Sequence, residues 1–273
     1  MKYKNKLKDQ HKMTNNPFKA HGVEYLSPSS LNQFASNPAK WLTKVAGYRD
    51  YLYKPPFTYG NAIELGINEV IMEERTIPEA IDAAMEEFYR TRRTAEEKGL
   101  YYDVDACNKK QSRCADVLTQ IIPQYQNLGT PIASQRWVEW QWDDFPIPIR
   151  GILDFEYEDC VRDLKTTSTR PKGNTNYDRQ LTFYALATGK MPIVDYVYTL
   201  AKSCELISFD IQDVNRHVKD IKRIAMKMQR ILSISSDIEE VCYQSCLEPD
   251  LSNNNWYDQW GDNEAIGAKK LFF

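Results

Sequence analysis

The sequence has no C-x-x-C pair, no long apolar run and no positive net charge, and each absence excludes a class of protein. Its six cysteines lack the spacing of a disulfide framework, which favours a reducing compartment. No apolar run is long enough to span a membrane, and the first residues lack the apolar core of a secretory signal peptide. The net charge of −3 does not suit a protein that simply coats nucleic acid.

The charges are nevertheless unevenly distributed. Residues 1–20 hold six lysines against one aspartate, whereas residues 237–264 hold eight acidic residues and no lysine or arginine. We predict a basic, disordered arm over residues 1–24 and an acidic segment over 236–273 that ends in an apolar Leu-Phe-Phe. A chain of 273 residues is otherwise long enough for one large α/β domain with a helical insertion.

The stretch that carries the chemistry lies in the middle of the chain. Alternating apolar residues predict a strand over Ile147–Glu158, and a second strand follows an acidic turn at Cys160–Thr166. Asp163 and Lys165 are two residues apart, so both point to the same face of the second strand. Asp154 points to the same spot if the two strands pair as a hairpin.

Three charges that meet on a half-buried strand need a partner, because an unpaired buried charge is costly. Two carboxylates favour a hard cation such as Mg²⁺. A neighbouring lysine can orient or activate a water, or neutralise a phosphate under attack. The alternative is an exposed Asp163–Lys165 pair with Asp154 capping a turn, which a lone D-x-K pattern would favour.

Helices are predicted on both sides of this stretch. Ser27 is an expected N-cap before Pro28. Lys40, Lys44 and Arg49 form a basic edge that faces either DNA or solvent. A helix over Tyr59–Met72 carries Gly60, which permits close approach of another backbone.

Further periodic segments complete the predicted architecture. Charged helices are expected over 78–98 and 105–126, a strand over 135–143, strands at about 193–201 and 204–211, and a helix over Gln212–Leu232. We interpret the tryptophans of the strand at 135–143 as packing residues, with base stacking as the alternative. The basic outer face of the last helix either runs along DNA or is solvated.

Five short motifs occur in a recognisable order. They are L-S-P-S-S-L-N-Q-F (26–34), Y-G-N-A-I-E (59–64), G-I-L-D (151–154), D-L-K-T (163–166) and Q-L-T-F-Y (180–184). Together they resemble the PD-(D/E)XK nuclease superfamily, in particular its RecB-like and phage-exonuclease branches. The resemblance covers roughly residues 25–210, apart from a helical insertion at about 75–130.

The resemblance implies an α/β, restriction-endonuclease-like core over residues 25–235, with a central mixed β-sheet flanked by helices. By its motifs, Lys165 would position or activate the water, and Gln180 and Tyr184 would support the site. The cation, Mg²⁺ with Mn²⁺ as an alternative, would be held by Glu64, Asp154, Asp163 and the Leu164 carbonyl. Expected DNA contacts are Ser29, Ser30, Thr166, Arg170 and Lys172.

The implied function is a metal-dependent DNA exonuclease of phage recombination, repair or replication, located in the cytoplasm (the host's, if a phage encodes it). A structure-specific endonuclease, a cleavage-incompetent DNA-binding or assembly module, and an RNA-processing enzyme are the alternatives. No iron–sulfur cluster is expected, because four thiolates in the necessary pattern are missing. A homo-oligomer is one option. The C-terminal Leu-Phe-Phe either docks on its own domain or binds a sliding clamp, a single-strand-binding protein or an annealing protein.

Overall fold

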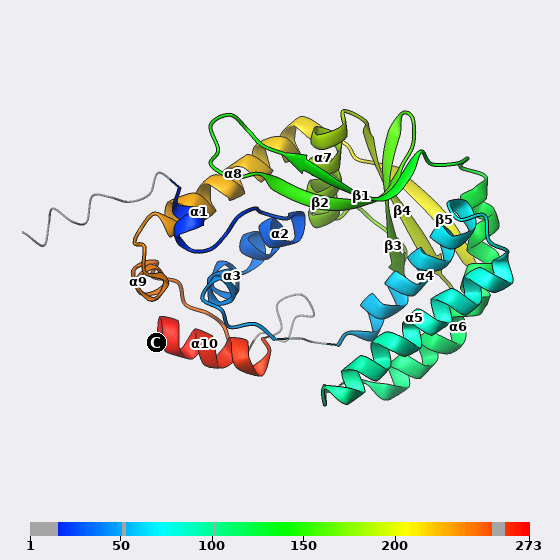
Figure 1. Cartoon of the computed structure of the whole chain (residues 1–273), viewed down its shortest axis with the longest axis horizontal. Helices are drawn as coiled ribbons and strands as arrows, with labels where there is room; N and C mark the ends of the chain where they lie inside the picture. Colours follow the sequence, from blue (N-terminus) through cyan, green and yellow to red (C-terminus); the bar gives the residue numbers. More distant parts are fainter. Residues whose placement is uncertain (1–15, 51–52, 101, 253–259) are drawn as a thin grey trace, which may run out of the picture. The chain divides into compact units, whose positions relative to one another are not determined.

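The computed structural model describes residues 16–50, 53–100, 102–252 and 260–273 (Figure 1). The chain forms two compact units. The central unit comprises residues 51–138 and 152–214, and the terminal unit comprises residues 1–50, 139–151 and 215–273. The acidic segment 236–273 therefore belongs to the same unit as the first 50 residues and does not form a part of its own.

A five-stranded sheet confirms the predicted mixed α/β core. Its strands follow in the order β1 (Ala133–Trp140), β2 (Ile149–Glu156), β3 (Cys160–Thr167), β4 (Met191–Thr199) and β5 (Cys204–Asp210). The β2–β3 and β4–β5 pairs are antiparallel, whereas β3 and β4 are parallel. A parallel pair needs a crossover, and α7 (Thr175–Thr188) lies between those two strands in the chain.

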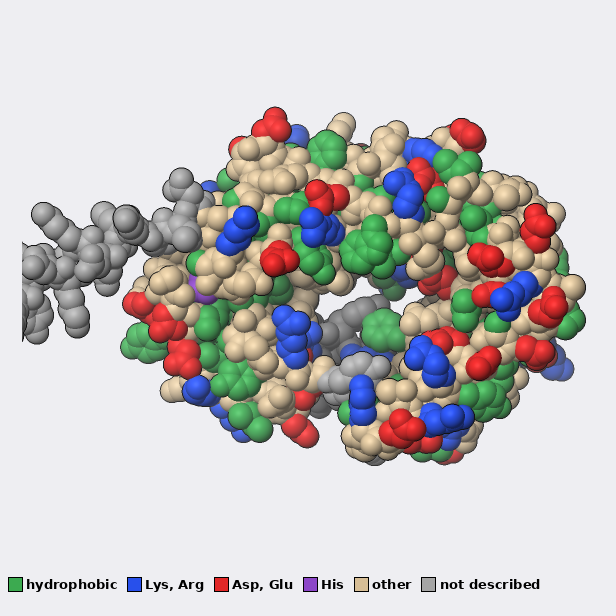
Figure 2. Space-filling model, in the orientation of Figure 1, with side chains coloured by type: hydrophobic (Ala, Val, Ile, Leu, Met, Phe, Trp, Pro, Cys, Tyr) green, Lys and Arg blue, Asp and Glu red, His purple; other side chains and the backbone are tan. Residues whose placement is uncertain are grey.

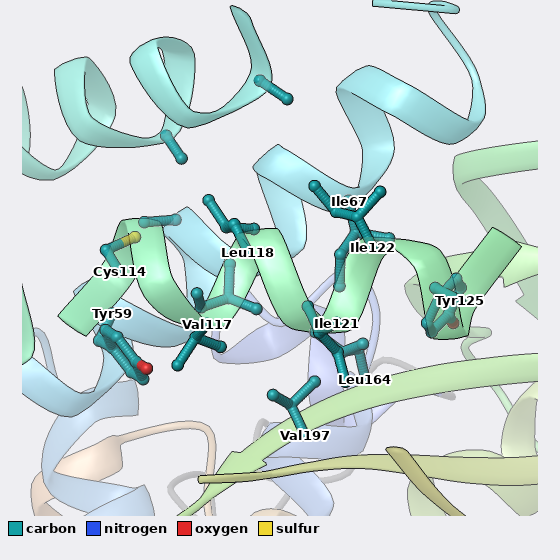
Figure 3. Packing of buried hydrophobic residues seen from close by; sticks show 14 of the residues in the cluster. Tyr59, Ile67, Cys114, Val117, Leu118, Ile121, Ile122, Tyr125, Leu164 and Val197 are labelled. Carbon is teal, nitrogen blue, oxygen red and sulfur yellow. The ribbon is translucent and has the colours of Figure 1, made fainter. Parts of the chain in front are cut away.

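Three helices of the central unit pack together beside the sheet: α4 (Pro55–Ile71), α5 (Ile77–Glu97) and α6 (Val104–Gln126). The last two are the helices predicted within the insertion at 75–130. Figure 3 shows side chains of α6 between α4 and the strands, with Ile121 close to Leu164 and Val197. Each fully buried side chain of this size contributes about 1.5–3 kcal/mol, so this layer is the main core of the unit.

The terminal unit is built from helices at both ends of the chain. They are α1 (Pro17–Ala20), α2 (Pro28–Ser36), α3 (Pro38–Val45), most of α8 (Val214–Leu232), α9 (Ile238–Gln244) and α10 (Asp262–Phe272). Ser27 caps α2 as predicted, because its side chain accepts a hydrogen bond from the Ser30 amide. None of the helices in the described ranges combines the length and the apolarity that a membrane span requires.

Two predictions for this unit need correction. Residues 17–20 form a helix rather than part of a disordered arm, because Phe18 is fully buried and its ring lies 5.4 Å from that of Phe145. Residues 1–15 of the predicted arm lie outside the described residues. Lys40 does not lie on an exposed basic edge, since it is buried and its ammonium lies 3.3 Å from the Glu264 carboxylate.

The Lys40–Glu264 pair joins α3 to α10, and Lys44 adds a half-exposed cation 3.4 Å from the same carboxylate. The Asp50 side chain also accepts a hydrogen bond from the Glu264 amide, at 2.7 Å. Leu271 is buried at the end of α10, whereas Phe273 is exposed. The apolar end of the chain thus docks in part on its own unit.

Charges of both signs are interspersed on the face drawn in Figure 2, where red and blue side chains lie beside one another. The basic cluster Arg90, Arg92 and Arg93 on α5 is also partly neutralised. Arg90 pairs with Glu87 at 2.7 Å and Arg92 pairs with Glu96 at 3.0 Å. This helix therefore offers less free positive charge than its sequence indicates.

The close contact between α4 and α6 yields a first prediction. A Cβ atom on Gly66 would lie 2.6 Å from a terminal carbon of the fully buried Leu118. We expect Gly66→Ala to lower the free energy of unfolding by about 1–3 kcal/mol, although alanine is the better helix former. Urea denaturation measures this loss. A double variant that carries Leu118→Val in addition to Gly66→Ala should recover part of it. An unchanged or raised midpoint for Gly66→Ala would contradict this packing.

The buried ion pair yields a second prediction. Glu264→Gln leaves Lys40 buried without its carboxylate, so the free energy of unfolding should fall by about 3 kcal/mol or more. Lys44→Gln, which removes only the half-exposed cation, should cost less than about 1 kcal/mol. Chemical denaturation of the two variants side by side tests the difference, and equal losses would argue against a buried pair.

Candidate active site

The β2–β3 hairpin brings the two predicted aspartates together. Phe155 is the register partner of Arg162, so Asp154 and Asp163 lie opposite each other on adjacent strands. Asp163 is fully buried. Asp154 Oδ2 accepts a hydrogen bond of 2.8 Å from the Leu164 amide, which fixes the first carboxylate beside the second strand.

Lys165 lies directly against the buried carboxylate. Its ammonium forms an ion pair with Asp163 Oδ2, which has no other hydrogen-bond donor among the described residues. Burial opposes the charge on Lys165, but the carboxylates of Asp163 and Asp154 outweigh it and raise the pKa of the lysine. The two carboxylates therefore favour the protonated, charged form of Lys165.

The helix α7 supplies the supporting pair on the other side of Asp163. Gln180 Nε2 donates to Asp163 Oδ1 at 3.0 Å and to the Tyr184 hydroxyl at 3.1 Å. The Tyr184 hydroxyl in turn donates to the Ile152 carbonyl of β2 at 2.5 Å. Two residues four apart on one helix face thus link both strands of the hairpin.

Glu64 on α4 is the third carboxylate. Its side chain accepts a hydrogen bond from Gln135 on β1. Burial, followed by the charge of Asp163, raises the pKa of Glu64 from 4.5 to about 7, while Lys165 and Gln135 oppose the shift. Burial and the charges of Asp163 and Glu64 also hold the pKa of Asp154 well above its usual range. The three carboxylates therefore act on one another.

The chemistry of these donors fits a divalent cation. The set consists of three carboxylates and contains no thiol or imidazole. Mg²⁺ and Mn²⁺ prefer oxygen donors of this kind. The buried Asp163 Oδ2 is paired only with the Lys165 ammonium among the described residues. Across the described ranges, however, no three His, Cys, Asp or Glu side chains are gathered closely enough to hold an ion.

A family model identifies the superfamily of this chain. The model of the PD-(D/E)XK nuclease superfamily matches residues 25–246, which is most of the chain. The chain belongs to the PD-(D/E)XK nuclease superfamily. Among solved structures, the crystal structure of SSO0001 is similar at 15% identity and a TM-score of 0.31, over 52% of this chain and 74% of that chain. No curated protein matches.

Members of this superfamily are hydrolytic nucleases that generally depend on divalent metal ions. In this nuclease, the structure brings together five of the residues predicted for the site: Asp154, Asp163, Lys165, Gln180 and Tyr184. Glu64 joins them through its charge and through Gln135. The role of each residue stays a prediction, as does a Leu164 carbonyl ligand.

The predicted DNA contacts lie in different places. Thr166 is on β3, and a Cβ atom on Gly60 would lie 3.3 Å from its hydroxyl, so the neighbour at this glycine is a side chain and not the predicted backbone. Arg170 and Lys172 are exposed in the loop before α7. Ser29 is exposed and Ser30 is half-buried in the cap of α2; both belong to the terminal unit.

The structure adds Gln135, which the sequence pattern did not single out. This residue has a left-handed φ of 47°, a conformation that is costly for a residue other than glycine. Trp137, two residues later on β1, is 61% exposed and is not the packing residue that alternation indicated. The sequence around these two residues does not predict either feature. The contact of Gln135 depends on how β1 packs against α4, and the exposure of Trp137 depends on which face of β1 meets solvent.

The raised pKa of Glu64 predicts a specific pH dependence in metal-free protein. Between pH 4.5 and about 7, Glu64 keeps its proton in the folded state but has lost it in the unfolded state. The free energy of unfolding therefore falls as pH rises through this window. Glu64→Gln should remove up to about 3 kcal/mol of this fall. Denaturation in EDTA at several pH values measures it, with Glu205→Gln as an exposed control. An unchanged slope in Glu64→Gln would contradict the shift.

Proposed function

We propose that this nuclease is a metal-dependent DNA exonuclease of the RecB-like or phage type, acting in DNA recombination, repair or replication. The observation that carries the proposal is the cluster of Asp154, Asp163 and Lys165, in which Gln180 donates a hydrogen bond to Asp163. The order of the five sequence motifs supports the branch. A cytoplasmic location, in a host cell if a phage encodes the protein, belongs to the same proposal.

Each residue has a role that follows from its surroundings. Asp154, Asp163 and Glu64, with the Leu164 carbonyl, would hold Mg²⁺ or Mn²⁺, which supplies Lewis-acid activation of water and phosphate. Lys165 carries a positive charge next to the scissile phosphate and stabilises the negative charge that develops there. We assign Lys165 this electrostatic role together with positioning or activating the attacking water. Gln180 and Tyr184 are positioning residues.

Two other functions remain as outcomes of the test. A structure-specific endonuclease would use the same residues on internal phosphodiester bonds. A DNA-binding or assembly module without cleavage would have no use for an ammonium held against a buried carboxylate, so the Lys165–Asp163 pair favours an enzyme.

To test the proposal, purified protein is incubated with end-labelled linear DNA and closed circular DNA in Mg²⁺, Mn²⁺ or EDTA. Stepwise loss of linear DNA alone, blocked by EDTA, is the expected result.

Substitutions at the pair give the sharpest prediction. Asp163→Asn and Lys165→Met should each lower the rate of cleavage by at least ~100-fold, since each removes a charge used in the transition state. Asp210→Asn, at the exposed end of β5, is the matched control and should cleave normally. Circular dichroism verifies that the variants fold. Full cleavage by folded Asp163→Asn would exclude the proposed site.

A further inference from the structure

The helix α8 has two chemically distinct faces. Its buried face is lined by His217, Ile221, Ile224, Ala225, Met228 and Leu232. The opposite, exposed face carries five cations, which we call the α8 stripe: Arg216, Lys219, Arg223, Lys227 and Arg230. Their spacings of three and four residues place them on one side of the helix. With a rise of 1.5 Å per residue, the stripe is about 21 Å long.

This stripe is poorly neutralised. Arg223 pairs with Asp220 at 2.9 Å, but no ion pair joins Arg216, Lys219, Lys227 or Arg230 to any other residue in the described part of the chain. The basic cluster of α5 differs, since Arg90 and Arg92 each pair with a glutamate on the same helix. Lys222, on the flank of α8, also has a partner in Asp144, at 2.8 Å.

An arrangement of this kind opposes folding. Like charges three and four residues apart on a helix repel each other and destabilise it. The chain as a whole carries a net charge of −3, so general basicity does not account for the stripe. A row of cations on one face is most readily stabilised by a long, regular polyanion.

We propose that the α8 stripe binds the phosphate backbone of DNA as a contact outside the catalytic carboxylates. This inference rests on the proposed function, because it assigns the stripe to the nucleic-acid substrate. Duplex DNA presents roughly a dozen phosphates over the ~21 Å length of the stripe. Backbone contacts of this type position the substrate without reading its sequence.

A membrane surface fits the stripe less well. A helix that binds at a membrane interface inserts an apolar face, but the apolar face of α8 is already buried. On the exposed side, the only large apolar residue of α8 with substantial exposure among the described residues is Met226. The stripe thus offers charge without an insertion surface.

The test measures binding without cleavage. Asp163→Asn protein in EDTA is titrated with a fluorescein-labelled DNA duplex by fluorescence anisotropy at several salt concentrations. The stripe variant carries Arg216→Gln, Lys219→Gln, Lys227→Gln and Arg230→Gln. The control variant carries Arg93→Gln, Lys109→Gln, Lys202→Gln and Lys269→Gln, four exposed cations on other elements with the same total charge change.

We expect the stripe variant to bind at least ~10-fold more weakly, with a salt dependence of log K that is shallower by about 2–4 units. The control variant should bind within about threefold of the parent. Equal losses in both variants, or an unchanged salt dependence in the stripe variant, would overturn the proposal. Loss of binding to phosphatidylserine vesicles with normal DNA binding would also overturn it and assign the stripe to membranes.

The outcomes separate this inference from the proposed function. Because binding is measured in EDTA on a cleavage-silent variant, it does not depend on nuclease activity. Cleavage by the parent protein with normal binding by the stripe variant would reject the stripe alone. Absent cleavage with weakened binding by the stripe variant would reject the nuclease and keep the stripe as a DNA contact. Circular dichroism confirms that both variants keep the helical content of the parent.

Discussion

The buried carboxylate of Asp163 is the constraint on which the central unit depends. Placing an acid out of water beside two further carboxylates is unfavourable, and the raised pKa values of Asp154 and Glu64 reflect it. The cost is offset by the ammonium of Lys165 and the amide of Gln180. Because these groups come from one strand and one helix, the site exists only when β3 and α7 are correctly packed.

The opposite face of β3 carries a second polar cluster that holds this strand in register. Asp195 of β4 is fully buried. It accepts hydrogen bonds from Arg162 at 2.8 Å, Ser208 at 2.6 Å and Tyr125 at 3.0 Å. Arg162 immediately precedes Asp163, so the two side chains point to opposite faces of the strand. A satisfied buried network is rigid, and it fixes the strand from which Asp163 and Lys165 project.

Local patterns were enough to predict the parts of the fold and of the site that depend on near neighbours. The cap at Ser27, the Asp154–Asp163 hairpin and the Gln180–Tyr184 pair each involve residues that are close in the chain or on one periodic element. The burial of Lys40 was not predictable, since its partner Glu264 lies near the other end of the sequence. The same applies to Gln135, whose left-handed backbone and contact with Glu64 depend on tertiary packing.

An acidic active site in a chain of negative net charge raises the question of how a polyanion is retained. Carboxylates that favour a cation repel DNA when the cation is absent, and Lys165 is engaged with Asp163. Substrate affinity must therefore come from positive charge that is not already paired. The cations of α5 are partly neutralised by neighbouring glutamates, whereas only Arg223 of the α8 stripe has an ion-pair partner among the described residues. The proposed arrangement separates attraction from chemistry: the carboxylates would bind a metal while the α8 stripe would hold the DNA backbone.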